Sequence, residues 1–243
     1  MNKKVLITGS SKGIGEAIAR VLAKNAYEVC LCGRNAHALE KLSLEIGAKG
    51  FCIVDLTQPN AAEKLFDEAN KILGNIDVLI NNAGEYFYSA VENTHEDMVD
   101  RLLTLNTKVP YQLISCCVSR MKDNKFGRIV NIGSISGTVG EANASLYSMT
   151  KSAFQGMTKA LALELAQDNI TVNTINPGYV QTELLENTFD KDFTKEELMD
   201  MIPQARFINP EEIANLVKYL VSDEAKGLTG QSISLCAGMS IGC

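Results

Sequence analysis

Three side chains in the middle of the chain have the types and the spacing for proton transfer at an oxygen atom. Tyr147 and Lys151 are four residues apart, so on a helix the phenol and the ammonium lie on one face. A nearby ammonium stabilises a phenolate, which predicts a lowered pKa for Tyr147. Ser134, thirteen residues before Tyr147, adds a hydroxyl at the end of a predicted strand. The three together predict acid–base chemistry on an alcohol or a carbonyl group.

A glycine-rich loop near the N-terminus predicts a site for a dinucleotide. Residues 8–15 read T-G-S-S-K-G-I-G and separate the first predicted strand from the first predicted helix. Glycines allow a tight turn and a close approach of the ligand, and a helix N-terminus attracts pyrophosphate. The spacing G-x-x-x-G-x-G differs from the commoner G-x-G-x-x-G. We expect the ligand contacts to come from Gly9, Ser11, Lys12, Gly13, Ile14 and Gly15.

The end of the second predicted strand indicates which nicotinamide cofactor fits. An Asp or Glu at this point would bind both hydroxyls of the adenosine ribose and would repel a 2′-phosphate. The chain has Gly33 and Arg34 there, and Lys12 stands in the glycine loop. Two cations that converge on the ribose suit a phosphate through charge-assisted hydrogen bonds. The sequence therefore predicts NADP(H) rather than NAD(H).

The remaining pattern predicts how these residues are positioned. Short apolar runs alternate with longer segments of helical periodicity, such as Ile14–Lys24, which is typical of a parallel sheet covered by helices on both faces. We expect residues 1–243 to form a single α/β domain with a doubly wound, Rossmann-type sheet of about seven parallel strands. The predicted strands are Val5–Thr8, Glu28–Cys32, Gly50–Val54, Val78–Asn81, Arg128–Gly133, Thr171–Asn176 and Ser232–Cys236.

Residues 182–208 interrupt this alternation between the sixth strand and a helix that begins near Asn209 and Pro210. A long insertion after a strand of such a sheet lies over the ligand crevice, so we interpret it as a substrate lid. The alternative is a plain helical connection without a role in binding.

Composition excludes several classes of function. The chain has 23 Lys and Arg against 29 Asp and Glu, and a formal charge of −6, which argues against nucleic-acid or anionic-membrane surfaces. It lacks the ~18–20 uninterrupted apolar residues of a membrane span, and its first residues lack a signal-peptide core, so we expect a cytoplasmic protein. The seven cysteines form no metal-ligand pattern and are interpreted as free, buried thiols, with no metal site.

In order along nearly the whole chain, the sequence resembles the short-chain dehydrogenase/reductase family. The resemblance is carried by the loop from Thr8 to Gly15, Asp55, Asn81-Asn82-Ala83-Gly84, Asn106, Ser134, Tyr147, Lys151 and Pro177-Gly178. It implies an oxidoreductase in which a nicotinamide supplies or accepts a hydride.

The resemblance also implies a role for each of these residues. Tyr147 would protonate the carbonyl oxygen, Ser134 would hydrogen-bond it, and Lys151 would bind the nicotinamide ribose and lower the pKa of Tyr147. Asn106 would hold a water molecule that relays protons from Lys151, unless its side chain only satisfies main-chain groups. The implied cofactor contacts beyond the glycine loop and Arg34 are Asp55, Leu56, Asn82, Ala83, Gly84, Tyr147, Lys151, Pro177, Gly178, Val180 and Thr182.

Residues Asn209-Pro210-Glu211-Glu212-Ile213-Ala214 and Leu228-Thr229-Gly230-Gln231 resemble, within the family, bacterial 3-oxoacyl-[acyl-carrier-protein] reductases most. These reductases act in fatty acid biosynthesis. The resemblance implies a 3-oxoacyl thioester, bound to coenzyme A or to acyl carrier protein, and a homotetramer or homodimer. The positions that match the carrier-docking cations beside the active site are Lys125, which keeps the charge, and Asp168, which reverses it. Acidic residues in the lid would also repel an acidic carrier: Glu183, Glu186, Asp190 and Asp192.

Two alternatives remain at this point. One is a family member that acts on another small ketone, a hydroxysteroid or a secondary-metabolite alcohol. The other is a non-catalytic NADP(H) sensor, which would not need Ser134, Tyr147 and Lys151 together.

Overall fold

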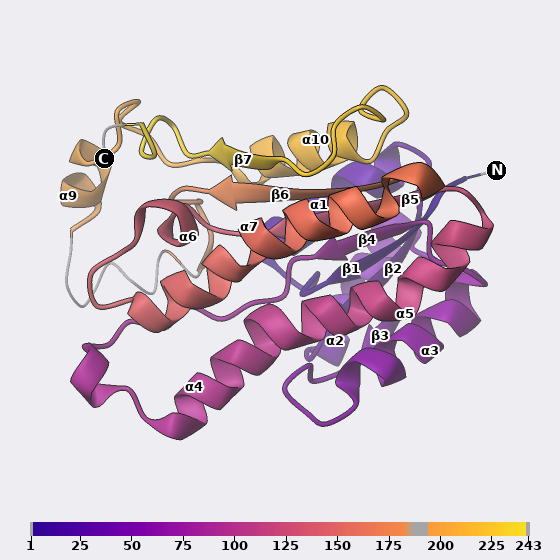
Figure 1. Cartoon of the computed structure of the whole chain (residues 1–243), viewed down its shortest axis with the longest axis horizontal. Coiled ribbons are helices and arrows are strands. Elements are labelled where there is room, and N and C mark those ends of the chain that lie inside the picture. Colours follow the sequence, from indigo (N-terminus) through magenta and orange to yellow (C-terminus); the bar gives the residue numbers. More distant parts are fainter. Residues whose placement is uncertain (1, 184, 186–193, 242–243) are drawn as a thin grey trace.

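The computed structural model describes residues 2–183, 185 and 194–241. Within this part of the chain, seven parallel strands form one sheet in the order β3-β2-β1-β4-β5-β6-β7 (Figure 1). The single-domain Rossmann-type prediction is confirmed. The strands are β1 (Lys4–Thr8), β2 (Glu28–Gly33), β3 (Gly50–Ile53), β4 (Val78–Asn81), β5 (Gly127–Ile132), β6 (Ile170–Pro177) and β7 (Ser232–Leu235).

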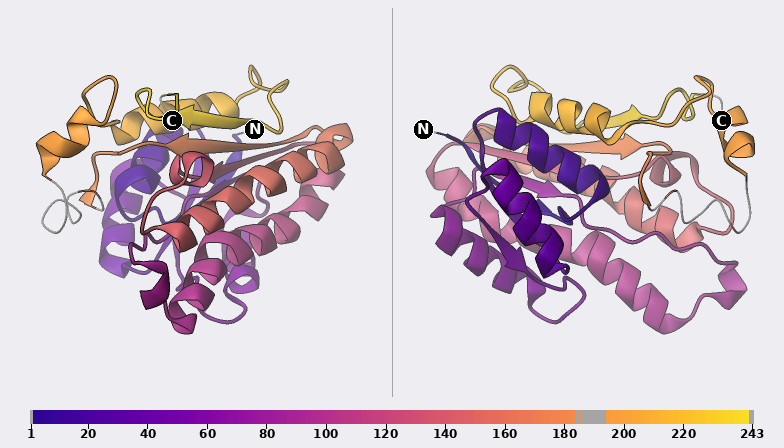
Figure 2. Two further views of the ribbon diagram at one scale, coloured as in Figure 1. Left: turned by 60° about the vertical axis from the view of Figure 1, so that its left-hand side comes forward. Right: turned by 180° about the vertical axis from the view of Figure 1, so that it is seen from behind.

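Helices cover both faces of the sheet, because successive strand residues point to opposite sides and both sides are apolar. One layer consists of α1 (Gly13–Lys24), α2 (Ala36–Ile46) and α10 (Pro210–Leu220). The other consists of α3 (Ala61–Leu73), α5 (Val109–Asp123) and α7 (Ser145–Leu165). Helices α5 and α7 lie in front of the sheet in Figure 1, and α1 and α2 come to the front in the reversed view of Figure 2.

The alternation is visible in β1, where Val5 and Ile7 pack with the first layer and Leu6 packs with the second. All three side chains are fully buried.

The predicted first helix begins one residue earlier than expected, at Gly13. The helix that carries Tyr147 begins at Ser145, so that Tyr147 lies in its first turn.

Strands β1 and β4 are neighbours in the sheet, and the strand order runs outward from them in opposite directions. Strands β2 and β3 follow beside β1, and β5, β6 and β7 follow beside β4. In doubly wound sheets the ligand crevice lies at this point, outside the carboxyl ends of the strands. The glycine loop follows β1, and residues 82–84 follow β4. Ser134 follows β5 at the same edge, so the topology gathers the predicted site residues there.

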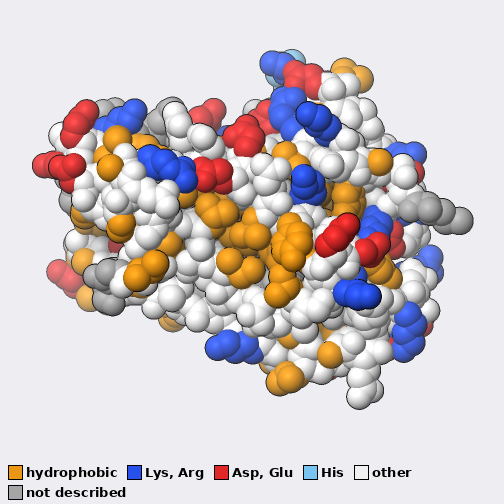
Figure 3. Space-filling view, turned by 90° about the horizontal axis from the view of Figure 1, so that it is seen from above, with side chains coloured by type: hydrophobic (Ala, Val, Ile, Leu, Met, Phe, Trp, Pro, Cys, Tyr) orange, Lys and Arg blue, Asp and Glu red, His pale blue; other side chains and the backbone are white. Residues whose placement is uncertain are grey.

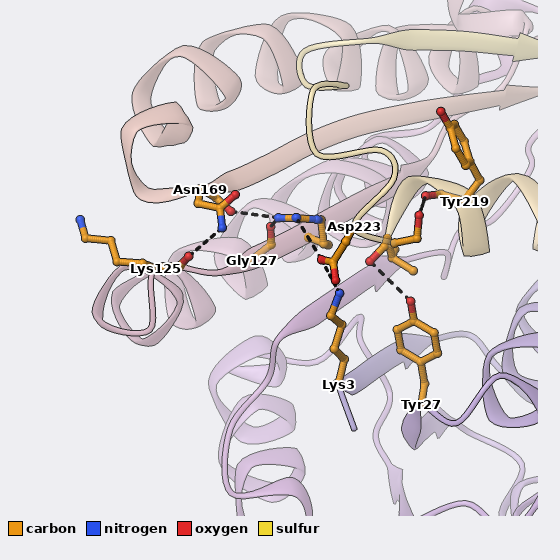
Figure 4. A network of polar contacts seen from close by, with 10 residues as sticks. Lys3, Tyr27, Lys125, Gly127, Asn169, Tyr219 and Asp223 are labelled. Atoms are coloured by element: carbon orange, nitrogen blue, oxygen red, sulfur yellow. Dashed lines mark hydrogen bonds and ion pairs between the residues drawn. The ribbon is translucent and has the colours of Figure 1, made fainter. Parts of the chain in front are cut away.

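The opposite, amino edge of the sheet contains a different polar cluster (Figure 4). Arg128 at the start of β5 is fully buried, and its guanidinium donates to the carbonyl oxygens of Gly127 and Asn169, each at 2.9 Å. It stacks on the ring of Phe126 and lies 3.9 Å from the Asp223 carboxylate. These contacts join the start of β5 to the start of β6.

Lys125 and Asp168 also lie at this amino edge, where their side chains form an ion pair. Lys125 precedes β5 and Ser134 follows it, so the six residues of β5 separate them by roughly 20 Å. The expectation that these two positions flank the active site is therefore wrong within one chain. Its cause is topological, because residues at the two ends of one strand lie at opposite edges of the sheet.

The cysteines lie mainly in the core. Cys30, Cys32, Cys52, Cys117 and Cys236 are buried, Cys116 is half-buried, and all six are free thiols, which confirms the interpretation for the described part of the chain.

Among the described residues, none of the helices combines the length and the apolar composition needed to cross a membrane. In the same part of the chain, no group of three or more His, Cys, Asp or Glu side chains is arranged to hold a metal ion.

On the face above β7 and α10, hydrophobic side chains gather at the centre, and acidic and basic side chains are mixed around them (Figure 3).

Candidate active site

A cleft of about 710 Å³ opens at the carboxyl edge of the sheet. It brings Ser134, Tyr147 and Lys151 together from two elements, the end of β5 and helix α7. The predicted cofactor residues that line the same cleft are Ile14, Asn82, Gly84, Pro177, Gly178, Val180 and Thr182. Tyrosines and aliphatic side chains form most of its other walls, among them Tyr86, Tyr88, Val139, Tyr179, Leu198, Met201 and Met239.

Lys151 is held as a buried amine at the floor of the cleft. Its side chain is almost fully buried in α7, and its Nζ donates to the carbonyl oxygen of Ile132 at 2.9 Å. Burial disfavours the ammonium and lowers the pKa of Lys151 to about 8. The amine also lies 5.7 Å from the centre of the Tyr147 ring. A substituent on Gly84 would come within 3.2 Å of Nζ, so the chain after β4 passes directly over this amine.

The pKa of Tyr147 contradicts the prediction. Burial of the phenol raises its pKa to about 12, hydrogen bonding with Ser134 opposes the rise, and the negative charge of Glu141 adds to it. The sequence argument counted the Lys151 charge and left out desolvation, which is the larger effect in this cleft. In the described structure the phenol is therefore protonated at neutral pH.

Ser134 belongs to a chain of hydroxyl groups that ends at a carboxylate. Its Oγ accepts from the main-chain N–H of Ser136 at 3.1 Å and donates to the Ser136 hydroxyl at 3.1 Å. Ser136 donates to Glu141 Oε2 at 2.7 Å, and Tyr86 donates to Glu141 Oε1 at 2.6 Å. The Tyr86 ring packs edge-on against Tyr147, with 5.0 Å between the ring centres.

Sequence reasoning missed Ser136, Glu141 and Tyr86. Glu141 is the sole acidic residue between Ser134 and Tyr147, and this position could have marked it as a neighbour of the site. Tyr86 had no comparable signal, because its place depends on how the chain folds after β4.

The glycine loop is shaped by contacts that leave no room for side chains. A Cβ at Gly15 would lie 2.2 Å from the carbonyl oxygen of Gly9, and one at Gly9 would lie 2.8 Å from Cα of Ala83. The Asn82 amide donates to the carbonyl oxygens of Thr8 and Gly9, which ties the chain after β4 to the loop. No side chain of the described residues caps the N-terminus of α1, so its first N–H groups remain available to an anion.

The two predicted phosphate-binding cations differ in their contacts with the described residues. Arg34 is exposed after β2 and has no hydrogen bond or ion pair with the described residues. Lys12 forms an ion pair with Glu183 at 2.8 Å, and both side chains are about two-thirds exposed. Sequence spacing could not reveal this pairing, because Glu183 follows β6 and is far away along the chain. An exposed pair of this kind contributes little stability, about 0–1 kcal/mol, and separates easily.

Three further predicted residues, Asn106, Asp55 and Leu56, are not among those that line the cleft. Asn106 is fully buried in the π-helical turn η2 (Thr104–Lys108), where its side chain binds the main chain of Glu85 and the Thr150 hydroxyl. Asp55 accepts from the N–H and the hydroxyl of Thr57, which lowers the pKa of its carboxyl group. The Leu56 side chain is buried in the core of the second layer.

The predicted lid is described only in part. Helix α9 (Lys195–Asp200) supplies Leu198 to the cleft, and Leu185 and Met201 also line it. Of the predicted acidic residues, Glu183 is exposed and paired with Lys12. Glu186, Asp190 and Asp192 lie outside the described residues.

Comparisons with known proteins place this geometry in a family. Residues 9–240 match the family model described as enoyl-(acyl carrier protein) reductase. The chain belongs to the short-chain dehydrogenase/reductase family. It is 35% identical to the 3-oxoacyl-[acyl-carrier-protein] reductase FabG of Staphylococcus aureus and 34% identical to the D-beta-hydroxybutyrate dehydrogenase of Rhizobium meliloti, with 98% of each chain covered in both cases. A crystal structure of YwfH, an NADPH-dependent reductase involved in bacilysin biosynthesis, is similar with a TM-score of 0.93 and 30% identity over the full length of both chains.

Proposed function

We propose that this protein is an NADP(H)-dependent oxidoreductase that reduces a ketone to a secondary alcohol. The observation that carries the proposal is the meeting of Ser134, Tyr147 and Lys151 in one cleft beside the glycine loop. A bound nicotinamide would supply the hydride. The protein would orient the ketone and donate the proton that the resulting alkoxide needs.

The protonation state of Tyr147 fits the role of proton donor in ketone reduction. Tyr147, with a pKa of about 12, carries the proton that a carbonyl oxygen must receive. Ser134 would turn from Ser136 to donate to the same oxygen, and Lys151 would bind the ribose of the cofactor and resupply the proton. The relay of protons through a water molecule at Asn106 remains a prediction. In the described structure the side-chain amide of Asn106 forms its hydrogen bonds with Glu85 and Thr150.

The donor set fits a phosphorylated dinucleotide. The uncapped N-terminus of α1 suits the pyrophosphate, and the exposed Arg34 suits a 2′-phosphate. Lys12 would join Arg34 by leaving Glu183. The remaining adenosine contacts are proposed at Asp55 and Leu56, where the main chain of Leu56 is the available group because its side chain is buried.

For the substrate, we favour a 3-oxoacyl thioester, because the cleft is mainly apolar and the relatives include a 3-oxoacyl-[acyl-carrier-protein] reductase. Small or coenzyme-A-linked thioesters would be accepted, and carrier-bound ones would gain nothing from Lys125 of the same chain, which is paired at the far edge. The segment 182–208 is proposed as the lid over this substrate. The alternative is another ketone, such as a steroid or a small cyclic ketone.

We also propose that the protein assembles as a homotetramer or homodimer through α5 and α7. A groove between these helices contains Tyr111, which is 57% exposed, and Leu163 of α7 is 83% exposed. Large exposed apolar side chains on two neighbouring helices are typical of an interface. Light scattering of the wild type and of Leu163→Glu would test this.

The function is tested by following NADPH oxidation with acetoacetyl thioesters, small diketones, quinones and hydroxysteroids. We expect turnover of acetoacetyl-coenzyme A. Turnover of a steroid or cyclic ketone without any reduction of thioesters would favour the alternative substrate, and no turnover of any ketone would contradict the proposed function.

A further inference from the structure

The cleft holds a carboxylate that the proposed chemistry does not use. Glu141 follows the short helix α6 (Ser136–Val139) and lines the cleft between Ser134 and Tyr147. Its two oxygens accept from Ser136 at 2.7 Å and from Tyr86 at 2.6 Å. The carboxylate is thus two hydrogen bonds away from Ser134, the side chain expected to hold the reacting oxygen.

Glu141 is not neutralised by a neighbouring cation. The charged side chains among the described lining residues are Glu85, Glu141 and Lys151. Glu85 forms an ion pair with Arg101 at 2.8 Å, whereas Glu141 has no ion pair within the described residues. Burial is the main cause of the raised pKa of Tyr86, Tyr147 and Tyr179, and the negative charge of Glu141 adds to the rise in all three, so this charge is felt by three tyrosines that line the cleft.

We propose that Glu141 selects substrates by charge, so that the cleft accepts ketones that are uncharged or cationic near the carbonyl group and rejects those that carry a carboxylate there. The inference rests on the proposed function, because it assigns the substrate class of the same site. In a free 3-oxo acid, the carboxylate is separated from the ketone by one methylene and would lie beside Glu141. The corresponding ester or thioester is neutral at this place.

The size of the effect is set by Coulomb repulsion between the Glu141 carboxylate and the substrate carboxylate. Two unit charges about 6 Å apart at the effective dielectric constant of a protein surface repel each other enough to change an equilibrium by one to two powers of ten. Glu141 is half-buried, so screening by solvent favours the lower end of this range. Ser136 and Tyr86 act as positioning residues, since their hydroxyl groups fix the two carboxylate oxygens.

The test compares matched substrates that differ in one charge: acetoacetate, methyl acetoacetate and the N-acetylcysteamine thioester of acetoacetate. The ratio of kcat/KM for acetoacetate to kcat/KM for the methyl ester is measured for the wild type, Glu141→Gln and Glu63→Gln. Glu63 is an exposed residue of α3 outside the cleft, so its variant makes the same change in net charge elsewhere. We expect Glu141→Gln to raise the ratio at least tenfold, and Glu63→Gln to leave it unchanged.

The dependence of the acid-to-ester ratio on salt is a second measurement, and a purely structural role of Glu141 would not affect it. Raising the ionic strength from 0.05 to 0.5 M should raise the acid-to-ester ratio of the wild type and leave that of Glu141→Gln nearly constant. If Glu141→Gln does not fold, Glu141→Ala must give the same relief. Equal ratios in the wild type and the folded variant would overturn the proposal.

A second pair of substrates separates the two proposals. If no acetoacetyl compound is reduced, the thioester assignment fails, and the same ratio is then measured with pyruvate and its methyl ester, in which the charge also lies next to the ketone. A rise of at least tenfold in Glu141→Gln with this pair would support charge selection without the thioester assignment. If the wild type reduces neither ester, both proposals are contradicted.

Discussion

The two edges of the sheet show two uses of buried polar groups. At the amino edge, the buried guanidinium of Arg128 donates to the carbonyl oxygens of Gly127 and Asn169 (Figure 4). These hydrogen bonds connect β5 to the start of β6. At the carboxyl edge, Lys151, Tyr147 and Ser134 lie beside an open cleft, where a ligand can take up part of their hydrogen bonding. One strand, β5, connects both clusters. Burial shifts the pKa at both edges, but the buried groups bind the main chain at the amino edge and face an open cleft at the carboxyl edge.

The largest effect should follow from removing the phenol at the carboxyl edge. Tyr147→Phe keeps the ring and its contact with Tyr86 while it removes the proton donor. We expect kcat for ketone reduction to fall at least about 10²-fold, the lower end for general acid catalysis, with NADPH affinity within a few-fold of the wild type. Steady-state rates and fluorescence titration measure both quantities. A variant with a tenth of the wild-type turnover would exclude Tyr147 as the acid.

The matching change at the amino edge should affect stability instead. Arg128→Met leaves the carbonyl oxygens of Gly127 and Asn169 without their donor in the interior, which costs about 3 kcal/mol in the free energy of unfolding. Urea unfolding gives this value, and the specific activity of the folded variant should stay within twofold of the wild type. A large loss of activity per folded molecule would contradict the separation of the two edges.

The pH dependence of stability should reveal the buried amine. The pKa of Lys151 is about 8 in the folded protein and about 10.5 when unfolded, so the unfolded state binds more protons between these values. The free energy of unfolding should therefore rise between pH 8 and 10 relative to Lys151→Met, with a limit of about 3 kcal/mol. Above pH 10 the raised pKa of Tyr147 acts in the opposite direction. Parallel stability curves for the two proteins would show that Lys151 is not desolvated.

Removing the charge of Arg34 should lower the affinity for NADPH more than removing the charge of Lys12. We expect NADPH to bind at least tenfold more tightly than NADH, and Arg34→Ala to weaken NADPH binding by one to two powers of ten with little change for NADH. Lys12→Ala should have the smaller effect, because Lys12 must first leave Glu183. Fluorescence titration with both cofactors measures these changes. Equal dissociation constants for NADPH and NADH in the wild type would contradict the assignment of Arg34.

The sequence predicted the sheet because its signals are local. Apolar runs located each of the seven strands of the described residues to within one residue at either end, and β4 was predicted at its observed bounds, Val78–Asn81. The Ser134, Tyr147 and Lys151 set could be recognised because strand ends of a parallel sheet meet at one edge. The sheet needed only periodicity and topology, whereas the roles of Ser134, Tyr147 and Lys151 also rested on the resemblance to the family.

The errors concern quantities that depend on three-dimensional environment. The pKa of Tyr147 was predicted to fall, and burial raises it instead. Lys125 and Asp168 were placed beside the site from their sequence offsets, although a whole strand separates them from it. The pairing of Lys12 with Glu183 and the placement of Glu141 both arise from loops, whose paths short-range patterns do not determine.

The central claim is that this chain transfers a hydride from NADPH to a ketone carbon, and isotope transfer tests it most directly. The wild-type enzyme is given acetoacetyl-N-acetylcysteamine and NADPH that carries deuterium at both positions of C4, and the product is analysed by mass spectrometry. The account predicts a 3-hydroxy product with one deuterium on its carbinol carbon, and almost none of this product from Tyr147→Phe. A reduced product without deuterium, or no reduction of any ketone by an enzyme that binds NADPH, would contradict it.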